Sequence, residues 1–206
     1  MNDLHGTPSK THLKVLSPIC FLLLSLSTGL GSLLNITHST IGSGTIGAFS
    51  FTNASITISE LADPSSRVEL TTPNVSGFSI DDLSASITIS GLGLFHFTCP
   101  TRTFVNNSFG VVGFSRSGEN RADLLDGPTA APFFEWDMFS PVGPITGPGQ
   151  FVQWAGTGLP PITTDIGILI FNDASPNVTF QVTLVPEPST AALLSLFLIG
   201  FAMKRR

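Results

Sequence analysis

The chain has 206 residues, of which 42% are hydrophobic and only 11% are charged, and its net charge at pH 7 is −5. This length suits one domain with accessory segments, and the small charged fraction is typical of an exported, β-rich protein rather than a charge-coated cytosolic enzyme. Between residues 30 and 185 four arginines, no lysine and twelve acidic residues give a net charge of −8. Nucleic acid is excluded as a partner, because binding to phosphates needs a basic face.

The N-terminal segment predicts a secretory signal peptide over residues 1–31. Lys10 and Lys14 precede an apolar run at 15–26, and small residues follow at 27–29. A basic region, an apolar run and small residues at the cleavage site are the parts of a signal peptide, in that order. The apolar run, Cys20 included, is expected to be removed. The alternative is an uncleaved membrane anchor.

Residues 32–184 are expected to form one exported domain of β-strands. Alternation of apolar and polar residues, which is typical of half-buried strands, occurs at 55–59, 68–70, 86–90 and 180–184. Longer apolar runs at 91–99, 109–114 and 166–171 suit strands that are buried on both faces. Turn residues separate these segments, at positions that include 63–64, 106–107, 126–127 and 175–177. The pattern predicts an all-β fold, a β-sandwich of jelly-roll type, with 126–149 as a long structured connection.

One hexapeptide occurs twice in this domain. Residues 54–59 and 85–90 both read Ala-Ser-Ile-Thr-Ile-Ser. Two copies are too few for a solenoid, and the similar composition of many strands explains them better.

The sequence predicts no metal site, no cofactor and no enzyme. The domain contains only His38 and His96 and has no Cys-x-x-Cys, so a zinc site lacks ligands. Acidic pairs such as Asp123 with Asp126 match no calcium loop. No Gly-x-Ser-x-Gly motif is present, and neither histidine lies in a hydrolase signature.

Two aromatic residues and one thiol have alternative roles. Trp136 and Trp154 are candidates for a sugar-binding platform, because the faces of aromatic rings stack on the apolar faces of sugars; the alternative places both in the core. Cys99 remains once the signal peptide is removed. It is expected to be a small buried hydrophobe, with a reactive thiol or an intermolecular disulfide as the alternative.

The C-terminal segment, residues 185–206, has three parts. Pro186, Glu187 and Pro188 form a stiff, extended peptide with one charge. The apolar residues 191–203, with 189–190 before them, form a candidate membrane helix. Lys204, Arg205 and Arg206 follow this helix and are expected to stay in the cytoplasm as a basic anchor, which places the Pro-Glu-Pro motif on the outer side.

This order of motif, helix and basic cluster resembles the PEP-CTERM sorting signal of exported bacterial proteins. The resemblance covers about a tenth of the chain. It implies processing by a membrane-embedded exosortase, transient anchoring in the inner membrane through residues 189–203, and delivery to the cell surface or extracellular matrix. It also implies an association with exopolysaccharide and biofilm. The alternative is a plain tail anchor that no enzyme recognises.

Together these observations predict an exported, non-enzymatic envelope or matrix protein whose partners are the exosortase, the inner membrane and extracellular polysaccharide. A carbohydrate-binding module and a secreted hydrolase are the alternatives for the domain itself.

Overall fold

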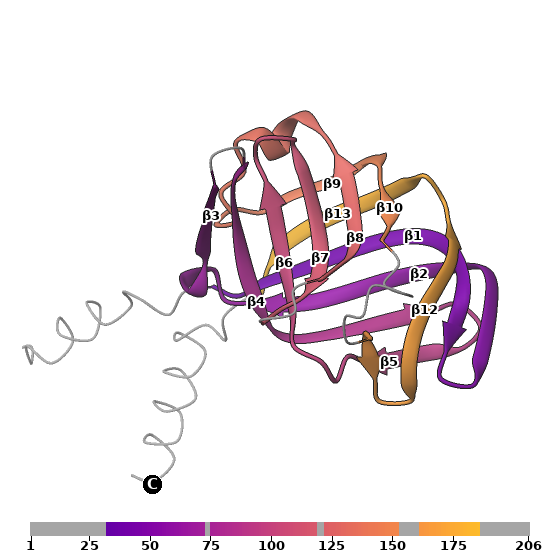
Figure 1. The fold of residues 1–206 in the computed structure, drawn as a ribbon. Coiled ribbons are helices and arrows are strands. Elements are labelled where there is room, and N and C mark those ends of the chain that lie inside the picture. The colour runs from indigo at the N-terminus through magenta and orange to yellow at the C-terminus, as the bar shows by residue number, and fades with distance from the viewer. Residues whose placement is uncertain (1–31, 73–74, 119–121, 153–160, 186–206) are drawn as a thin grey trace, which may run out of the picture. The chain divides into compact units, whose positions relative to one another are not determined.

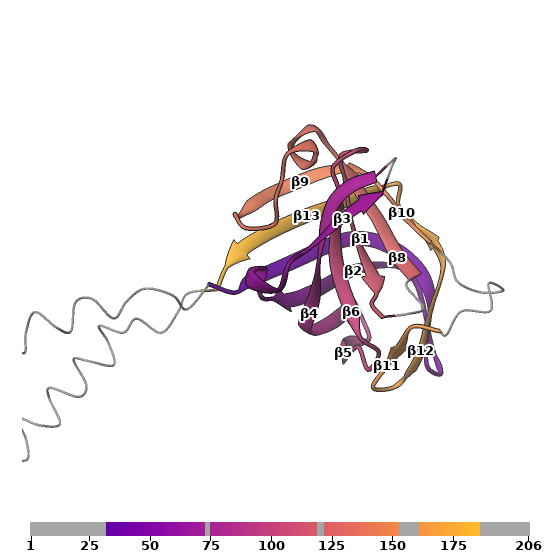
Figure 2. The ribbon, with the colours of Figure 1, turned by 60° about the vertical axis from the view of Figure 1, so that its left-hand side comes forward.

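The computed structural model describes residues 32–72, 75–118, 122–152 and 161–185. These residues form an all-β fold in which 13 strands belong to one antiparallel sheet (Figures 1 and 2). Two short 3-10 helices, η1 (Pro64–Ser66) and η2 (Ala131–Phe134), accompany the strands. The predicted all-β class is confirmed. The predicted segments 55–59, 68–70 and 180–184 lie inside strands. At 55–59 buried residues alternate with more exposed ones, as in a half-buried strand, whereas 68–70 has no buried residue. The apolar runs at 91–99 and 166–171 are not buried on both faces as predicted, since Leu94, Ile168 and Ile170 are exposed.

Six strands follow one another across the sheet in the same order as along the chain. They are β1 (Leu34–Ile46), β2 (Phe49–Ala62), β4 (Val75–Ile89), β6 (Thr101–Asn106), β7 (Val111–Arg116) and β8 (Ala122–Thr129). Such a sequential order is a meander, whereas a jelly roll interleaves strands from distant parts of the chain. The described strands therefore do not follow the jelly-roll order that we predicted from the sequence.

The remaining strands extend this meander. Beside β4 lie β3 (Val68–Thr72) and β5 (Gly93–His96), and β10 (Gln150–Phe151) pairs with β8. The first half of β1 pairs with β13 (Asn177–Leu184), and its second half pairs with β12 (Gly167–Ala174). The sheet is completed by β9 (Val142–Pro148) beside β13 and by β11 (Thr163–Thr164) beside β12.

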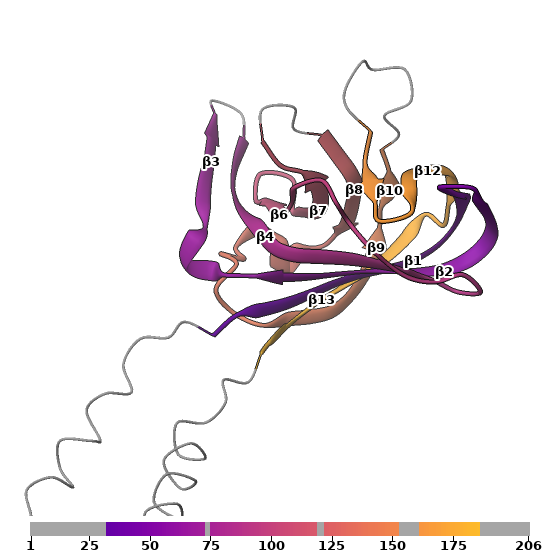
Figure 3. The same ribbon diagram turned by 90° about the horizontal axis from the view of Figure 1, so that it is seen from below.

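Strand β4 belongs to two parts of the sheet and makes it curl. Its residues 82–89 pair with β2, and its residues 77–81 pair with β6. Strands β6, β7 and β8 consequently run across the direction of β1, β2 and β13 (Figures 1 and 3). The concave side of the curled sheet encloses the core.

The repeated hexapeptide forms the centre of this arrangement. Residues 56–59 of β2 pair in antiparallel register with residues 86–89 of β4, so the two copies are direct neighbours. All four isoleucines of the two copies are buried: Ile56, Ile58, Ile87 and Ile89. Because side chains alternate across a strand, the threonines between them point to the other face. The shared sequence therefore provides two adjacent strands with matching apolar faces.

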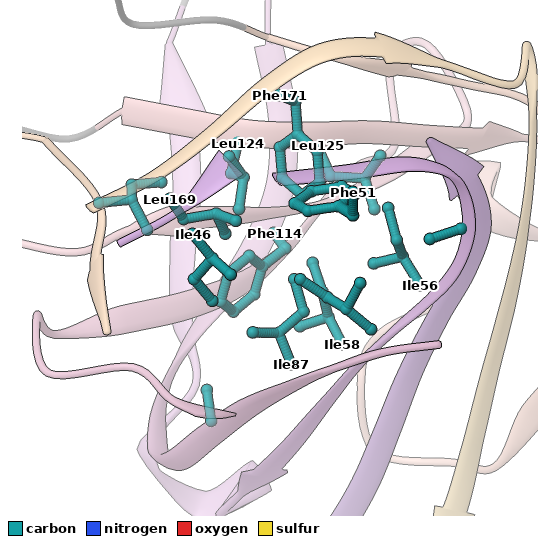
Figure 4. Close-up of a cluster of buried hydrophobic side chains, with 14 of the residues drawn as sticks. Ile46, Phe51, Ile56, Ile58, Ile87, Phe114, Leu124, Leu125, Leu169 and Phe171 are labelled. Atoms are coloured by element: carbon teal, nitrogen blue, oxygen red, sulfur yellow. The ribbon is translucent and has the colours of Figure 1, made fainter. Parts of the chain in front are cut away.

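The core has two clusters of buried side chains. In the first, Ile58 of β2 and Ile87 of β4 pack with Phe114 of β7 (Figure 4). The second is built around Phe180 of β13, whose ring meets Phe133 and Trp136 edge to face at centroid distances of 5.5 and 5.4 Å. Such pairs add stabilisation beyond the apolar area that they bury.

Two expectations about turns were wrong. Asp126 and Gly127 lie inside β8 rather than in a turn, at an irregularity where the register with β7 shifts and Gly127 has a φ of 129°. Turn-forming residues can also occupy a β-bulge, which needs the same backbone freedom. The segment 126–149 is also more than a connection, because it contains β9, which is held by its pairing with β13.

A methyl group at Gly113 should destabilise the sheet. A Cβ atom there would lie 2.3 Å from Cζ of Phe104 and 2.5 Å from the carbonyl oxygen of Leu125, both in neighbouring strands. We expect Gly113→Ala to lower the free energy of unfolding by about 1–3 kcal/mol, measured by urea denaturation. Ser84→Ala, at an exposed position of β4, should stay within about 0.5 kcal/mol of wild type. Equal stability of the two variants would contradict the close packing of β6, β7 and β8.

Candidate functional site

Two adjoining grooves lie where β8, β10 and β12 approach one another. The larger has a volume of about 530 Å³, and its lining includes Gly149, Gln150, Phe151, Phe171, Asn172 and Asp173. The smaller has a volume of about 330 Å³ and shares Gly149 and Gln150 with the larger, while Phe109, Val111, Asp126 and Thr129 line its other side. Both volumes fall in the range of small-ligand sites, about 300–1,000 Å³.

Glycine at position 149 allows the strands to approach each other at the junction of the two grooves. A Cβ atom at Gly149 would lie 2.5 Å from Cγ2 of Val178 and 2.9 Å from the carbonyl oxygen of Asp126. Directly after it, Gln150 and Phe151 pair with Asp126 and Leu125 of β8. The short strand β10 therefore lies against β8, and its two side chains line the grooves.

Aromatic rings line each groove. Phe151 stacks face to face on Phe171, with 3.6 Å between ring centroids and an interplanar angle of 14°. Phe171 is buried, whereas Phe151 is partly exposed. In the smaller groove Phe109, in the turn between β6 and β7, is 61% exposed. A hydrophobic side chain as exposed as Phe109 at the rim of a groove offers a ring face to a ligand.

The polar side chains of the grooves carry hydrogen-bonding groups and negative charge. Gln150 and Asn172 are exposed amides that can both donate and accept hydrogen bonds. Asp126 and Asp173 are the charged members of the described lining, which contains no basic side chain. Burial raises the pKa of Asp126 to about 6, and the charge of Asp123 adds to this rise.

A second polar cluster lies inside the core, between β2, β4 and β6. The hydroxyl of Thr103 contacts Oε2 of Glu60 and lies 3.2 Å from Oδ1 of Asp82. Thr103 and Glu60 are no more than 1% exposed. A hydroxyl has one proton, so Thr103 can donate to only one carboxyl group, and the other must carry a proton to bond to it. The geometry therefore favours a pair of carboxyl groups that keeps a proton.

The electrostatics of this cluster agree with its geometry. Burial raises the pKa of Glu60 well above its usual value, with a further rise from the charge of Asp82, against a hydrogen bond from Thr103. Burial also raises the pKa of Asp82, to about 7, although hydrogen bonds from Thr101 and Thr103 oppose the rise. Removing a carboxylate from water disfavours its charged form.

His38 borders the same cluster as a neutral side chain. Its Nε2 atom lies 3.7 Å from Oε1 of Glu60, and its ring meets Phe180 edge to face. Burial lowers the pKa of His38 to about 3, against a smaller opposing effect of the Gly127 backbone. At neutral pH this contact is therefore not an ion pair, and we interpret the cluster as part of the core.

The structure assigns a core role to one of the two candidate platform residues. Trp136 is 5% exposed, packs against Phe133 and Phe180, and donates a hydrogen bond from Nε1 to the carbonyl oxygen of Ser140. A buried indole offers no face to a sugar, so Trp136 takes the core alternative and is not part of a sugar platform. Trp154 lies outside the described residues.

The other predicted functional segments also lie outside the described residues. They include the signal peptide at 1–31, the sorting motif Pro186, Glu187 and Pro188, and the basic residues Lys204, Arg205 and Arg206. No helix within the described ranges has the length and apolar character needed to cross a membrane. Cys99 is buried, as expected, and its sulfur lies 3.8 Å from the carbonyl oxygen of Thr163.

The sequence contains a signal for the polar cluster in the core, in the alternation along two strands. In β2, Glu60 continues the alternation of the buried residues Ile56 and Ile58, and in β1 His38 continues that of Leu34 and Ile36. Counting in steps of two would have placed both polar residues inside. The grooves had no such signal, because they combine residues that are far apart in the chain.

The described residues contain no group of three histidine, cysteine, aspartate or glutamate side chains that could hold a metal ion. The chemistry that the grooves offer is ligand binding, through aromatic rings, amides and carboxylates. Comparison of the chain with protein-family models, with curated proteins and with solved structures finds no match.

Proposed function

We propose that this protein is an exported, non-enzymatic component of the bacterial envelope or extracellular matrix, sorted to the surface through its C-terminal segment. An exosortase-type enzyme processes it at Pro186, Glu187 and Pro188. The body folds as a β-sandwich, whose sheet halves are joined through β4. Residues 189–203 anchor it in the inner membrane before processing, and extracellular polysaccharide is its partner outside the cell.

The observation that best supports this proposal is the place where the two chain segments leave the body. Leu34 and Leu184 are register partners in β1 and β13, and the backbone N–H of Val185 donates to the carbonyl oxygen of Leu33 at 2.8 Å. The segments before residue 33 and after residue 185 therefore leave from one point. Because both connections leave at one end of the body, either segment can hold the body at a membrane while its opposite end stays accessible.

The orientation of the grooves fits such a tether. Pro176, which lines the larger groove, immediately precedes β13, whereas Leu184 is the last residue of that strand. A strand of eight residues spans roughly 25 Å. The grooves consequently lie at the far end of β13 from the point of attachment, where material outside the cell can reach them.

Substitutions in the sorting motif test the proposal. Glu187→Gln keeps the shape of the side chain and removes its charge, and Pro188→Ala restores a backbone donor and flexibility. If an exosortase recognises this peptide, both variants should be exported but accumulate as an unprocessed membrane form that retains residues 204–206. We expect the processed fraction to fall about tenfold or more, measured by cell fractionation and C-terminal peptide mapping.

Two controls sharpen this test. Glu135→Gln makes the same chemical change at an exposed position of the body and should leave processing unchanged. Reversal of Lys204, Arg205 and Arg206 to acidic residues should instead disturb membrane orientation. If wild type, Glu187→Gln and Pro188→Ala all retain the same intact C-terminus, the chain has a plain tail anchor and the sorting proposal is wrong.

The proposal that the protein is not an enzyme rests on the positions of the carboxyl groups whose pKa values are most strongly raised. Glu60 is 1% exposed and contacts Thr103 and His38, so a polymeric substrate has no access to it. Asp126 is the groove carboxyl group with a raised pKa, and a glycosidase would need a second carboxyl group at a defined distance from it. Release of reducing ends from a polysaccharide, abolished by Asp126→Asn, would replace this proposal by a secreted hydrolase.

A further inference from the structure

We infer that the two grooves beside β10 form one binding site for a neutral polysaccharide, with Phe109 as its ring platform and Gln150 as its central polar contact. This inference rests on the proposed function, since it identifies the kind of extracellular partner that the surface-displayed body binds. The site is assembled from the β6–β7 turn, β8, β10 and β12.

The shape of the site suits a chain of sugars rather than a single small molecule. The grooves of about 530 and 330 Å³ share Gly149 and Gln150, so they adjoin at β10. Phe109 lines only the smaller groove, and Phe151 lines only the larger one. An extended ligand that lies along both grooves would meet an aromatic side chain near each end and the Gln150 amide between them.

The chemistry of the lining matches that of a sugar. A hexose has apolar ring faces, bounded by C–H groups, and hydroxyl groups around its edge that both donate and accept hydrogen bonds. Phe109, 61% exposed, can stack on such a face. The amides of Gln150 and Asn172 can pair with hydroxyl groups in both directions, and Asp173 accepts from them. The exposed ring can therefore contact the apolar face of a sugar, and the polar side chains can bind its hydroxyl groups.

The charge of the site distinguishes among polysaccharides. Asp126 and Asp173 line the grooves, and no described lining residue is basic. The stretch between residues 30 and 185 also carries a net charge of −8. A polyuronate would bring carboxylates close to these acids, and like charges in a partly desolvated groove repel each other. The site therefore favours a neutral hexose polymer.

The test is a binding measurement on the purified full chain. The chain is kept in a polyoxyethylene detergent, which has no sugar head group that could compete. Titration calorimetry or affinity electrophoresis is carried out with three neutral polymers, a linear β-glucan, a galactomannan and a dextran, and with alginate as the polyuronate. Wild type should bind at least one neutral polymer and should bind alginate at least tenfold more weakly.

Substitutions then locate the site. Phe109→Ala and Gln150→Ala should each weaken binding of the neutral polymer about tenfold, since loss of one stack or one paired amide is worth roughly 1–1.5 kcal/mol. Phe49→Ala is the matched control, because Phe49 is 54% exposed and lines neither groove. Circular dichroism should show the same β-rich spectrum for all three variants.

Several outcomes would overturn the inference. The inference is wrong if wild type binds none of the neutral polymers, if it binds alginate more tightly than they bind, or if Phe109→Ala and Gln150→Ala leave binding unchanged. The assay uses purified protein and does not depend on export or on the sorting motif. Failed processing with intact binding would therefore reject the sorting proposal alone, whereas failed binding with normal surface delivery would reject the polysaccharide site alone.

Discussion

Replacing Phe180 with alanine should lower the free energy of unfolding by about 3–5 kcal/mol, the usual cost of removing a fully buried phenylalanine. The side chain is 0% exposed, and its ring contacts His38, Phe133 and Trp136. Its loss would leave a cavity where β13 and η2 meet, next to the fully buried ring of His38. The measurement is urea denaturation of residues 32–185, followed by circular dichroism.

Phe49→Ala supplies the control, since it removes the same side chain from a position that is 54% exposed. It should change the free energy of unfolding by no more than about 1 kcal/mol. If Phe180→Ala also costs less than about 1 kcal/mol, Phe180 does not occupy the centre of the second core cluster.

Replacing Asp82 with asparagine should change how the stability of the protein depends on pH. The pKa of Asp82 is about 7 in the folded chain, against its ordinary value of 3.8. Between these two values the folded state binds more protons than the unfolded state, so the Asp82 contribution lowers the free energy of unfolding as the pH rises. Because asparagine cannot titrate, the variant should gain on wild type by an amount on the order of 1–4 kcal/mol between pH 4 and pH 7.

The difference between the variant and wild type reports the carboxyl pair, because the charge of Asp82 also raises the pKa of Glu60. Glu60 acts in the same direction, since its pKa is also raised. His38 acts in the opposite direction: its pKa is lowered to about 3 from 6.5, so it raises stability as the pH rises through that window. The His38 contribution remains in the variant and largely cancels in the comparison. The pKa of Glu60 should fall when the charge of Asp82 is removed, and this change adds to the gain in stability of the variant.

Asp81→Asn is the matched control, because Asp81 is the exposed neighbour of Asp82 on the same strand. It should largely preserve the pH dependence of wild type, apart from a small change through its charge, which contributes to the raised pKa of Asp82. Urea denaturation at several pH values measures all three proteins. A constant difference between Asp82→Asn and wild type from pH 4 to pH 7 would contradict the buried carboxyl pair.

Alternation along single strands was readable from the sequence, and it located much of the core. The isoleucines of the two hexapeptides are buried as their spacing predicts, because a strand turns successive side chains to opposite faces. The same spacing placed Glu60 and His38 inside. Only the structure shows which side chains Glu60 contacts. Thr103 and Asp82, which form a hydrogen-bonded cluster with Glu60, come from two other strands.

Turn residues were a less reliable guide. Asp126 and Gly127 predict a turn in isolation, yet they form an irregular part of β8, because pairing with β7 and contact with β10 hold both sides of the strand. Trp136 is a similar case: its ring could serve a surface platform or the core, and only the position of Phe180 across the sheet decides between them.

The sequence by itself determined the all-β class, the buried face of the two hexapeptide strands and the expectation of an exported chain with a sorting tail, because these depend on periodicity, composition and short contiguous motifs. The tertiary structure alone decided the meander order of the strands, the carboxyl pair in the core, the common exit point of the two terminal segments and the grooves beside β10. The physical reason is that strand pairing and packing join residues far apart in the chain. Gly127 meets Gly149, and Phe151 meets Phe171, through contacts that no local pattern encodes.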